Sequence, residues 1–252
     1  MSSALAAESP ADITGPAALF YKRPEPLTAA GHGAWRLLPG DSAFAADTNT
    51  VMLAVSEFAA ASRSYPILFA GADRSPVALV GLERSNLFVT DGQWAEDSYV
   101  PAYVRRYPFI FYATDEAERF VLGLDTGCDR IVRDGEGGVA LFDGDQASAM
   151  TTQALHFCEA FRRDVEATTT FVAALKDLLI DQRAAVTLAS GENFDIDGFQ
   201  VVDRALFAAL NDATVIDWHR KGWLALVHFH LASLDRFQAL LNRQQATPAS
   251  VS

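Results

Sequence analysis

The sequence predicts an α+β fold, with a curved, mostly antiparallel sheet toward the N-terminus and a helical C-terminal part that contains one β-hairpin. Residues 17–142 hold short apolar runs bounded by turn signals, which is typical of strands. Residues 143–243 are dominated by apolar positions at helical spacing. No internal repeat or long linker separates these parts, so we expect one domain over residues 17–243. The small, polar segments 1–16 and 244–252 are expected to be disordered.

Five short apolar runs carry the strand prediction. They lie at residues 65–70, 76–82, 86–90, 109–112 and 120–124. The third run closes on the turn signal Asp91-Gly92, and the last two are expected to pair around a polar turn at 114–118. A helix is expected near residues 55–62, where apolar positions follow a helical spacing. A second short helix is expected over residues 100–106, with a proline in its first turn and a Tyr-Pro pair at its end.

The second part begins with a long helix. Residues 146–180 place apolar side chains on one helical face. A β-hairpin is then expected from residues 185–189 and 199–202, with its turn at 195–198.

Three more helices are expected after the hairpin. Asp203 is a candidate N-cap of the first, which ends near Leu210, and Asp212 is a candidate N-cap of the second. Gly222 stands where the second helix should stop, and the last helix is expected over residues 223–243.

The composition excludes several classes of protein. The formal net charge is −12 and the sequence pI is about 4.7, which argues against a nucleic-acid binder and against electrostatic docking to an anionic membrane. No apolar run approaches the roughly 18 residues that would span a bilayer. The N-terminal segment does not read as a secretory signal peptide, and two cysteines are too few for a disulfide framework. We therefore expect a cytoplasmic protein.

The histidines and cysteines do not form a recognisable metal site. His228 and His230 would share a face on a strand, but on the helix predicted here they point about 200° apart and cannot share a metal. His230 lies on the apolar stripe of that helix, so we interpret it as a hydrogen-bonded histidine at a helix interface. Cys128 and Cys158 have no metal-ligand spacing. We predict no metal and no cofactor.

The most informative segment is 99–112, which contains six aromatic residues, two prolines and two adjacent arginines. Aromatic surface is costly to leave in water, and paired guanidiniums are costly to bury without an anion. One interpretation is structural, with the arginines stacked on tyrosines and paired with carboxylates. The other is a site that anchors a carboxylate or phosphate of a small ligand or a protein partner. The candidate ligand- or partner-binding residues are Trp94, Tyr99, Tyr103, Arg105 and Arg106.

The same segment carries a resemblance to known proteins. Its residues 99–109, YVPAYVRRYPF, resemble the SapC-like family of bacterial proteins. Supporting matches are Trp35, Phe44-Ala-Ala46, Glu57-Phe58, Tyr65-Pro-Ile67, Ala78-Leu-Val-Gly-Leu82, Asn86-Leu-Phe88, Gly92-Gln-Trp94, Leu141-Phe-Asp143 and Gly222 with His230-Leu-Ala-Ser-Leu234. The resemblance spans roughly residues 21–241.

The resemblance implies a role but no chemistry. The family is named for a protein associated with bacterial surface layers. Its members often occur beside genes for TonB-dependent receptors, flavin-dependent halogenase-like proteins and iron/2-oxoglutarate hydroxylase-like proteins. That neighbourhood implies an accessory role alongside uptake or modification systems, and the resemblance supplies no catalytic residues.

Three functions follow as hypotheses. The first is a non-enzymatic binding or accessory protein that uses the aromatic and arginine residues named above. The second is an enzyme with an unfamiliar site, for which the candidates are Glu57, Asp125, Cys128 and His230. The third is a structural component associated with a surface layer. The oligomeric state is left open by the sequence.

Overall fold

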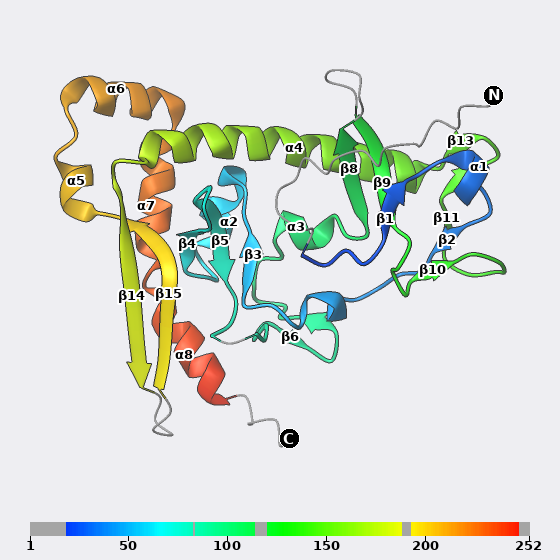
Figure 1. The fold of residues 1–252 in the computed structure, drawn as a ribbon, viewed down its shortest axis with the longest axis horizontal. Helices are drawn as coiled ribbons and strands as arrows, with labels where there is room; N and C mark the ends of the chain where they lie inside the picture. The colour runs from blue at the N-terminus through cyan, green and yellow to red at the C-terminus, as the bar shows by residue number, and fades with distance from the viewer. Residues whose placement is uncertain (1–18, 83, 114–119, 188–192, 247–252) are drawn as a thin grey trace, which may run out of the picture. The chain divides into compact units, whose positions relative to one another are not determined.

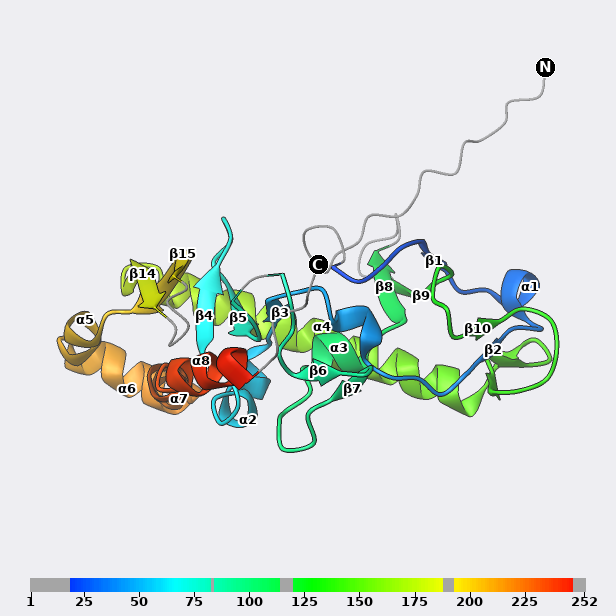
Figure 2. The same ribbon diagram turned by 90° about the horizontal axis from the view of Figure 1, so that it is seen from below.

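The chain folds as an α+β protein with mostly antiparallel strands and a helical C-terminal region, as predicted (Figures 1 and 2). The segment 1–16, the turn at 114–118 and the end of the tail at 247–252 lie outside the described residues. Of the tail, residues 244–246 form the last turn of a helix. The computed structural model describes residues 19–82, 84–113, 120–187 and 193–246.

The chain divides into two compact units, each assembled from two stretches of sequence. The first unit takes residues 1–40 and 106–162, and the second takes residues 41–105 and 163–252. The division cuts between the two arginines of the 99–112 segment.

A three-stranded antiparallel sheet in the order β1-β9-β8 forms the centre of the first unit. Phe109 lies opposite Leu124, which confirms the predicted pairing of the fourth and fifth apolar runs. The strands of this sheet are β1 (Pro24–Pro26), β8 (Phe109–Ala113) and β9 (Phe120–Asp125). The unit's other short elements are α1 (Ala29–His32), β2 (Arg36–Leu37), β10 (Ile131–Val132), β11 (Val139–Ala140), β12 (Phe142–Asp143) and β13 (Gln146–Ala147).

The apolar core of the first unit joins this sheet to the start of the long helix α4 (Ala149–Leu175). Burial of such side chains is the main favourable contribution to folding. The core residues are Leu37, Phe109, Phe111, Leu122, Leu124, Leu141 and Cys158.

A five-stranded antiparallel sheet in the order β14-β15-β4-β5-β3 forms the centre of the second unit. Its strands are β3 (Thr50–Met52), β4 (Ile67–Ala70), β5 (Ser75–Leu79), β14 (Leu179–Thr187) and β15 (Asn193–Val202). A separate hairpin joins β6 (Val89–Thr90) to β7 (Gln93–Trp94). Its turn is the predicted Asp91-Gly92, whose φ angles of 50° and 76° fit the two-residue hairpin turn that such a pair favours.

Helices α2, α7 and α8 lie on one side of this five-stranded sheet, as Figure 2 shows. The helices of the second unit are η1 (Ala43–Ala45), η2 (Val55–Glu57), α2 (Phe58–Ala61), α3 (Ala102–Arg105), α5 (Arg204–Ala208), α6 (Asp212–Lys221), α7 (Trp223–Ser233) and α8 (Arg236–Ala246). The helices expected near 55–62 and 100–106 are therefore present. The long helix expected over 146–180 is shorter than predicted, because residues 146–147 form β13 and residues 179–180 begin β14.

Local sequence signals located the start of α5 and the end of α6. Asp203 caps α5 by accepting hydrogen bonds from two backbone N–H groups, and Gly222 ends α6 with a φ of 73° that favours glycine. The cap of α6 is Asn211 rather than Asp212, because the Asn211 side chain accepts from the Thr214 N–H. The expected single helix over 223–243 is two helices, α7 and α8.

The hairpin expected after α4 is present, but its turn was placed wrongly. Residues 195–198 lie inside β15, where Ile196 pairs with Ala184 and Phe199 with Gln182. Three steps on β15 therefore match two on β14, which is a β-bulge, and Gly198 adopts a φ of 74° there. A glycine in a strand can mark a bulge as readily as a turn, which is why the local signal misled.

His230 joins α7 to the sheet of the second unit. Its Nε2 accepts from the Val202 N–H at 3.1 Å and its Nδ1 donates to the Ile67 carbonyl at 2.9 Å. The ring is therefore neutral, and both of its nitrogens are hydrogen-bonded. The Ile67 N–H donates to Ser233 Oγ at 2.9 Å. The prediction of a hydrogen-bonded interface histidine is confirmed, and burial lowers the pKa of His230 to about 4.

We predict that His230→Leu destabilises the protein by about 2–5 kcal/mol, because it leaves two buried backbone groups without partners.

The same histidine makes the stability of the wild type depend on pH. The pKa of His230 in the folded protein is near 4, below the ordinary value of 6.5, so between these two values the unfolded chain binds more protons than the folded chain. The contribution of the neutral His230 ring to the free energy of unfolding is therefore greatest above pH 6.5. It falls by about 3 kcal/mol as the pH drops toward 4. Urea unfolding from pH 4 to 8 tests this, with the exposed His219→Asn as control. Equal pH slopes in wild type and His230→Leu would contradict the assignment.

Candidate functional site

The candidate site is organised by a buried carboxylate, Glu57, which is 3% exposed. Its Oε2 accepts from the Ala54 N–H at 2.8 Å. Its Oε1 accepts from the Ala102 N–H at 2.7 Å and from the Tyr99 hydroxyl at 3.0 Å. Glu57 therefore ties the start of η2 to the start of α3. Burial raises the pKa of this carboxyl, although each donor favours the charged form.

Tyr99 connects this buried acid to the surface. Its hydroxyl donates to Glu57 and accepts from a terminal nitrogen of Arg105 at 3.1 Å. Burial raises the pKa of Tyr99 to about 12, so the hydroxyl keeps the proton that it donates to Glu57. The Arg105 Nε also donates to the Val100 carbonyl at 3.1 Å, and the guanidinium lies 5.7 Å from the centre of the Tyr99 ring. Arg105 itself is exposed.

Trp94 and Tyr65 hold Tyr99 from the other side. The Trp94 indole N–H donates to the Tyr65 hydroxyl at 2.9 Å, and that hydroxyl donates to the Tyr99 carbonyl. The Tyr99 N–H donates to Ser64 Oγ at 3.1 Å. Trp94 is 8% exposed, so it supports the position of Tyr99 from inside the unit rather than forming an open wall.

The structure therefore separates the five predicted site residues. One chain of hydrogen bonds joins Trp94, Tyr99 and Arg105. Tyr103 is buried within the second unit. Arg106 belongs to the first unit, is 2% exposed, and has its guanidinium 5.4 Å from the Tyr21 ring centre and 5.0 Å from that of Phe161. Arg106 thus fits the stacking interpretation, and Arg105 is the exposed member of the pair.

A second buried carboxylate, Asp125, plays a similar part in the first unit. Its Oδ1 accepts from the N–H groups of Arg23 at 2.7 Å and Gly127 at 3.0 Å. Its Oδ2 accepts from the Lys22 N–H and the Tyr107 hydroxyl, both at 3.0 Å. Four donors satisfy one carboxylate, which is a structural use of this side chain.

The candidate catalytic residues fall into different settings. Asp125 and Cys128 lie in one turn, and the Tyr107 side chain contacts both. Glu57 and His230 belong to the other unit, and each is hydrogen-bonded to backbone groups. Burial raises the pKa of the remaining thiol, Cys158, to about 11, so it stays protonated at neutral pH.

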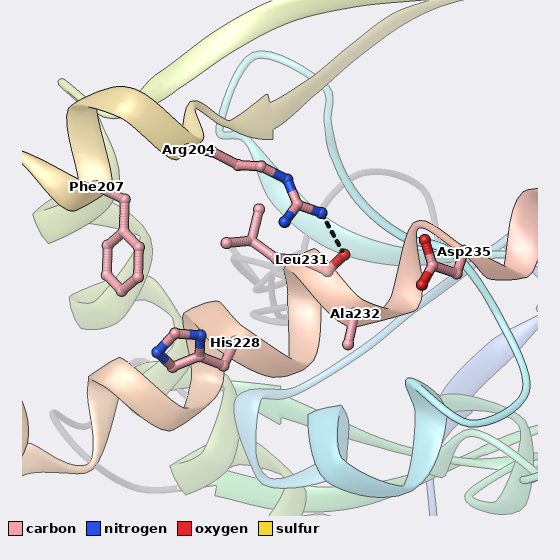
Figure 3. Close-up of a pocket in the computed structure, with 6 residues that line it drawn as sticks. All are labelled: Arg204, Phe207, His228, Leu231, Ala232 and Asp235. Carbon is pink, nitrogen blue, oxygen red and sulfur yellow. Dashed lines mark hydrogen bonds between the residues drawn. The ribbon is translucent and has the colours of Figure 1, made fainter.

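An open pocket of about 380 Å³ lies between α5 and α7 in the second unit (Figure 3). Its lining residues are Arg204, Phe207, His228, Leu231, Ala232 and Asp235. Arg204 donates to the Leu231 carbonyl at 3.3 Å, and the Phe207 and His228 rings meet edge to face at 5.4 Å. His228 and Ala232 lie one turn apart on α7, and this i, i+4 spacing is the sequence signal that could have indicated the pocket. None of the predicted site residues lines it.

The described part of the chain contains no group of three or more His, Cys, Asp or Glu residues placed to hold a metal ion. Within the same residues, none of the helices combines the length and the apolar character needed to cross a membrane.

Comparison with known proteins identifies one relationship. The model of the SapC family matches residues 27–240, which is most of the chain. Comparisons with curated proteins and with solved structures gave no match.

Replacement of Glu57 by glutamine tests the first carboxylate. The amide can present only one acceptor oxygen, so its NH₂ group must face a backbone or tyrosine donor. We expect Glu57→Gln to lower the free energy of unfolding by about 1–3 kcal/mol. Chemical denaturation measures the loss, with the exposed Glu96→Gln as the matched control. Equal stability of the two variants would contradict the role given to Glu57.

Asp125→Asn applies the same reasoning to the first unit. Both oxygens of Asp125 accept two hydrogen bonds, so either orientation of the amide places donors against donors. We expect a loss of about 2–3 kcal/mol. Asp129→Asn is the control, because the Asp129 side chain is 90% exposed. A loss no larger than that of the control would show that Asp125 is not an anchor of this unit.

Proposed function

Since the chain belongs to the SapC family, we propose that it is a non-enzymatic binding or accessory protein that recognises an anionic group through Arg105. The group recognised is a carboxylate or a phosphate on a small ligand or on a protein partner. The observation that supports this most is the setting of Arg105, an exposed arginine whose guanidinium is held by Tyr99 and Val100.

Preorganisation is the physical argument for Arg105. A free arginine side chain loses rotamer freedom when it binds, which reduces the affinity gained. In the folded protein the Nε and one terminal nitrogen of Arg105 are already hydrogen-bonded to neutral acceptors. Part of the rotamer freedom of this side chain is therefore lost on folding rather than on binding. Arginine also matches the planar geometry of carboxylate and phosphate groups.

The settings of the reactive side chains support binding rather than catalysis. The pKa of Tyr99 is raised to about 12, both ring nitrogens of His230 bond to the backbone, and Cys158 is a buried, protonated thiol. General acid–base catalysis needs groups with a pKa near the working pH and within reach of substrate. The proposal includes a cytoplasmic location, which the free thiols of Cys128 and Cys158 support.

The test compares the wild type with Arg105→Glu and Arg63→Glu, each purified gently from its source cells and weighed by native mass spectrometry. Arg63 is a matched control, because it is exposed and its Nε also donates to a backbone carbonyl. We expect the wild type and Arg63→Glu to carry an added mass, either a small anion or a polypeptide, whose occupancy falls at least tenfold in Arg105→Glu. An added mass retained equally by all three proteins, or found on none of them, would contradict the proposal.

A further inference from the structure

The β14–β15 hairpin extends beyond the rest of the five-stranded sheet (Figure 1). β15 pairs with β4 only at Phe199–Ala70 and Gln200–Phe69. Its pairing with β14 continues from there to Thr187–Asn193. Within the described residues, the far part of the hairpin is thus a ribbon of two strands that pair only with each other. Such ribbons are marginally stable in water unless further strands or other groups pack on them.

Among the described residues, no strand pairs with the outer edge of this ribbon. β14 is the first strand in the sheet order and is nine residues long. Residues 180–183 are all exposed, which means that side chains on both faces of the strand meet solvent. Proteins usually protect an edge strand with proline, a bulge or charged side chains of which lysine is the commonest. β14 contains neither proline nor lysine, the extra residue of the bulge lies on β15, and the charges on β14 are one of each sign, Asp181 and Arg183.

We propose that β14 pairs with β14 of a second copy of this chain, antiparallel about a twofold axis at Gln182. The two five-stranded sheets then form one continuous sheet across the dimer. Backbone hydrogen bonds between the two edges supply the association, as in other complexes formed by strand addition. This proposal is independent of the function assigned to Arg105, which lies outside β14.

The charges on β14 select this register. With Gln182 opposite itself, Asp181 of each copy faces Arg183 of the other, so one strand pairing creates two opposite-charge pairs. An axis at Asp181 or at Arg183 instead places like charges opposite each other. An axis at Ala184 places both charges opposite neutral residues, and an axis at Ile180 leaves Arg183 opposite a residue outside β14. An axis between neighbouring residues would place outward-facing backbone groups of one strand opposite inward-facing groups of the other, so it cannot form the ladder. Asp181 is already oriented by the Gln200 amide, which donates to it at 2.8 Å.

The apolar side chains agree with the same register. Ile180, which is 37% exposed, lies on the other face of β14 from Asp181. With the axis at Gln182, it stands opposite Ala184 of the second copy. Pairing therefore covers an exposed apolar side chain on one face and joins opposite charges on the other. The sequence around the axis is thus complementary to itself, which a twofold interface requires.

A charge-reversal cycle tests the proposal on the full chain. Sedimentation velocity over a range of concentrations is expected to show a dimer for the wild type. Asp181→Arg and Arg183→Asp should each weaken the dimer at least tenfold, because each places like charges opposite. The double variant Asp181→Arg/Arg183→Asp restores both pairs and should return to within threefold of the wild type. Circular dichroism of each variant establishes that it is folded.

Disulfide trapping gives a second readout that does not depend on charge. Gln182→Cys places the two thiols opposite each other at the axis, where Cβ atoms are about 5 Å apart, so oxidation should give a covalent dimer. Arg183→Cys is the control, because its two copies stand on a diagonal about 7–8 Å apart. The native thiols, Cys128 and Cys158, are buried and should not contribute. A monomer at all concentrations, or a dimer that is unaffected by charge reversal, would overturn the proposal, as would equal trapping of both cysteine variants.

Discussion

A carboxylate that is removed from water must be given hydrogen-bond donors, and this constraint organises both units of the protein. Glu57 draws together the Ala54 and Ala102 N–H groups and the Tyr99 hydroxyl. Asp125 does the same for the chain at Lys22 and Arg23 and for its own turn. An uncompensated buried charge would cost more than most single contacts contribute. Each acid therefore fixes segments that are far apart in the sequence.

The surface chemistry of the candidate site depends on this internal arrangement. Tyr99 donates to Glu57 and so leaves its oxygen to accept from Arg105. The position of an exposed cation is thereby set by a buried anion, through one neutral hydroxyl. The neighbouring arginine, Arg106, is instead buried, and its guanidinium lies over two aromatic rings. Arg106 fits the stacking interpretation of the pair, whereas Arg105 is the exposed arginine on which the proposed function rests.

The central and outer strands of the five-stranded sheet differ in how many of their backbone groups are hydrogen-bonded. At its centre, His230 and Ser233 of α7 satisfy both backbone groups of Ile67, so β4 is held by a helix as well as by its neighbours. At its outer edge, β15 leaves β4 after two paired residues, and β14 has no neighbour on its far side among the described residues. Association through β14 would supply to that edge the hydrogen bonds that α7 supplies to β4.

The sequence by itself determined the local elements and the family. The Asp91-Gly92 turn, the Asp203 cap and the Gly222 stop depend on a few adjacent residues, and all three are found where they were expected. The family match covers the block that first indicated it. Only the tertiary structure decided which arginine is exposed, which donors satisfy Glu57 and Asp125, and where β14 ends the sheet. Turn and capping signals act over a few residues, whereas burial, hydrogen-bond partners and strand register are set by segments that meet only in the folded chain. The same reason explains the turn misplaced at 195–198, because a bulge is defined by the partner strand and not by the glycine alone.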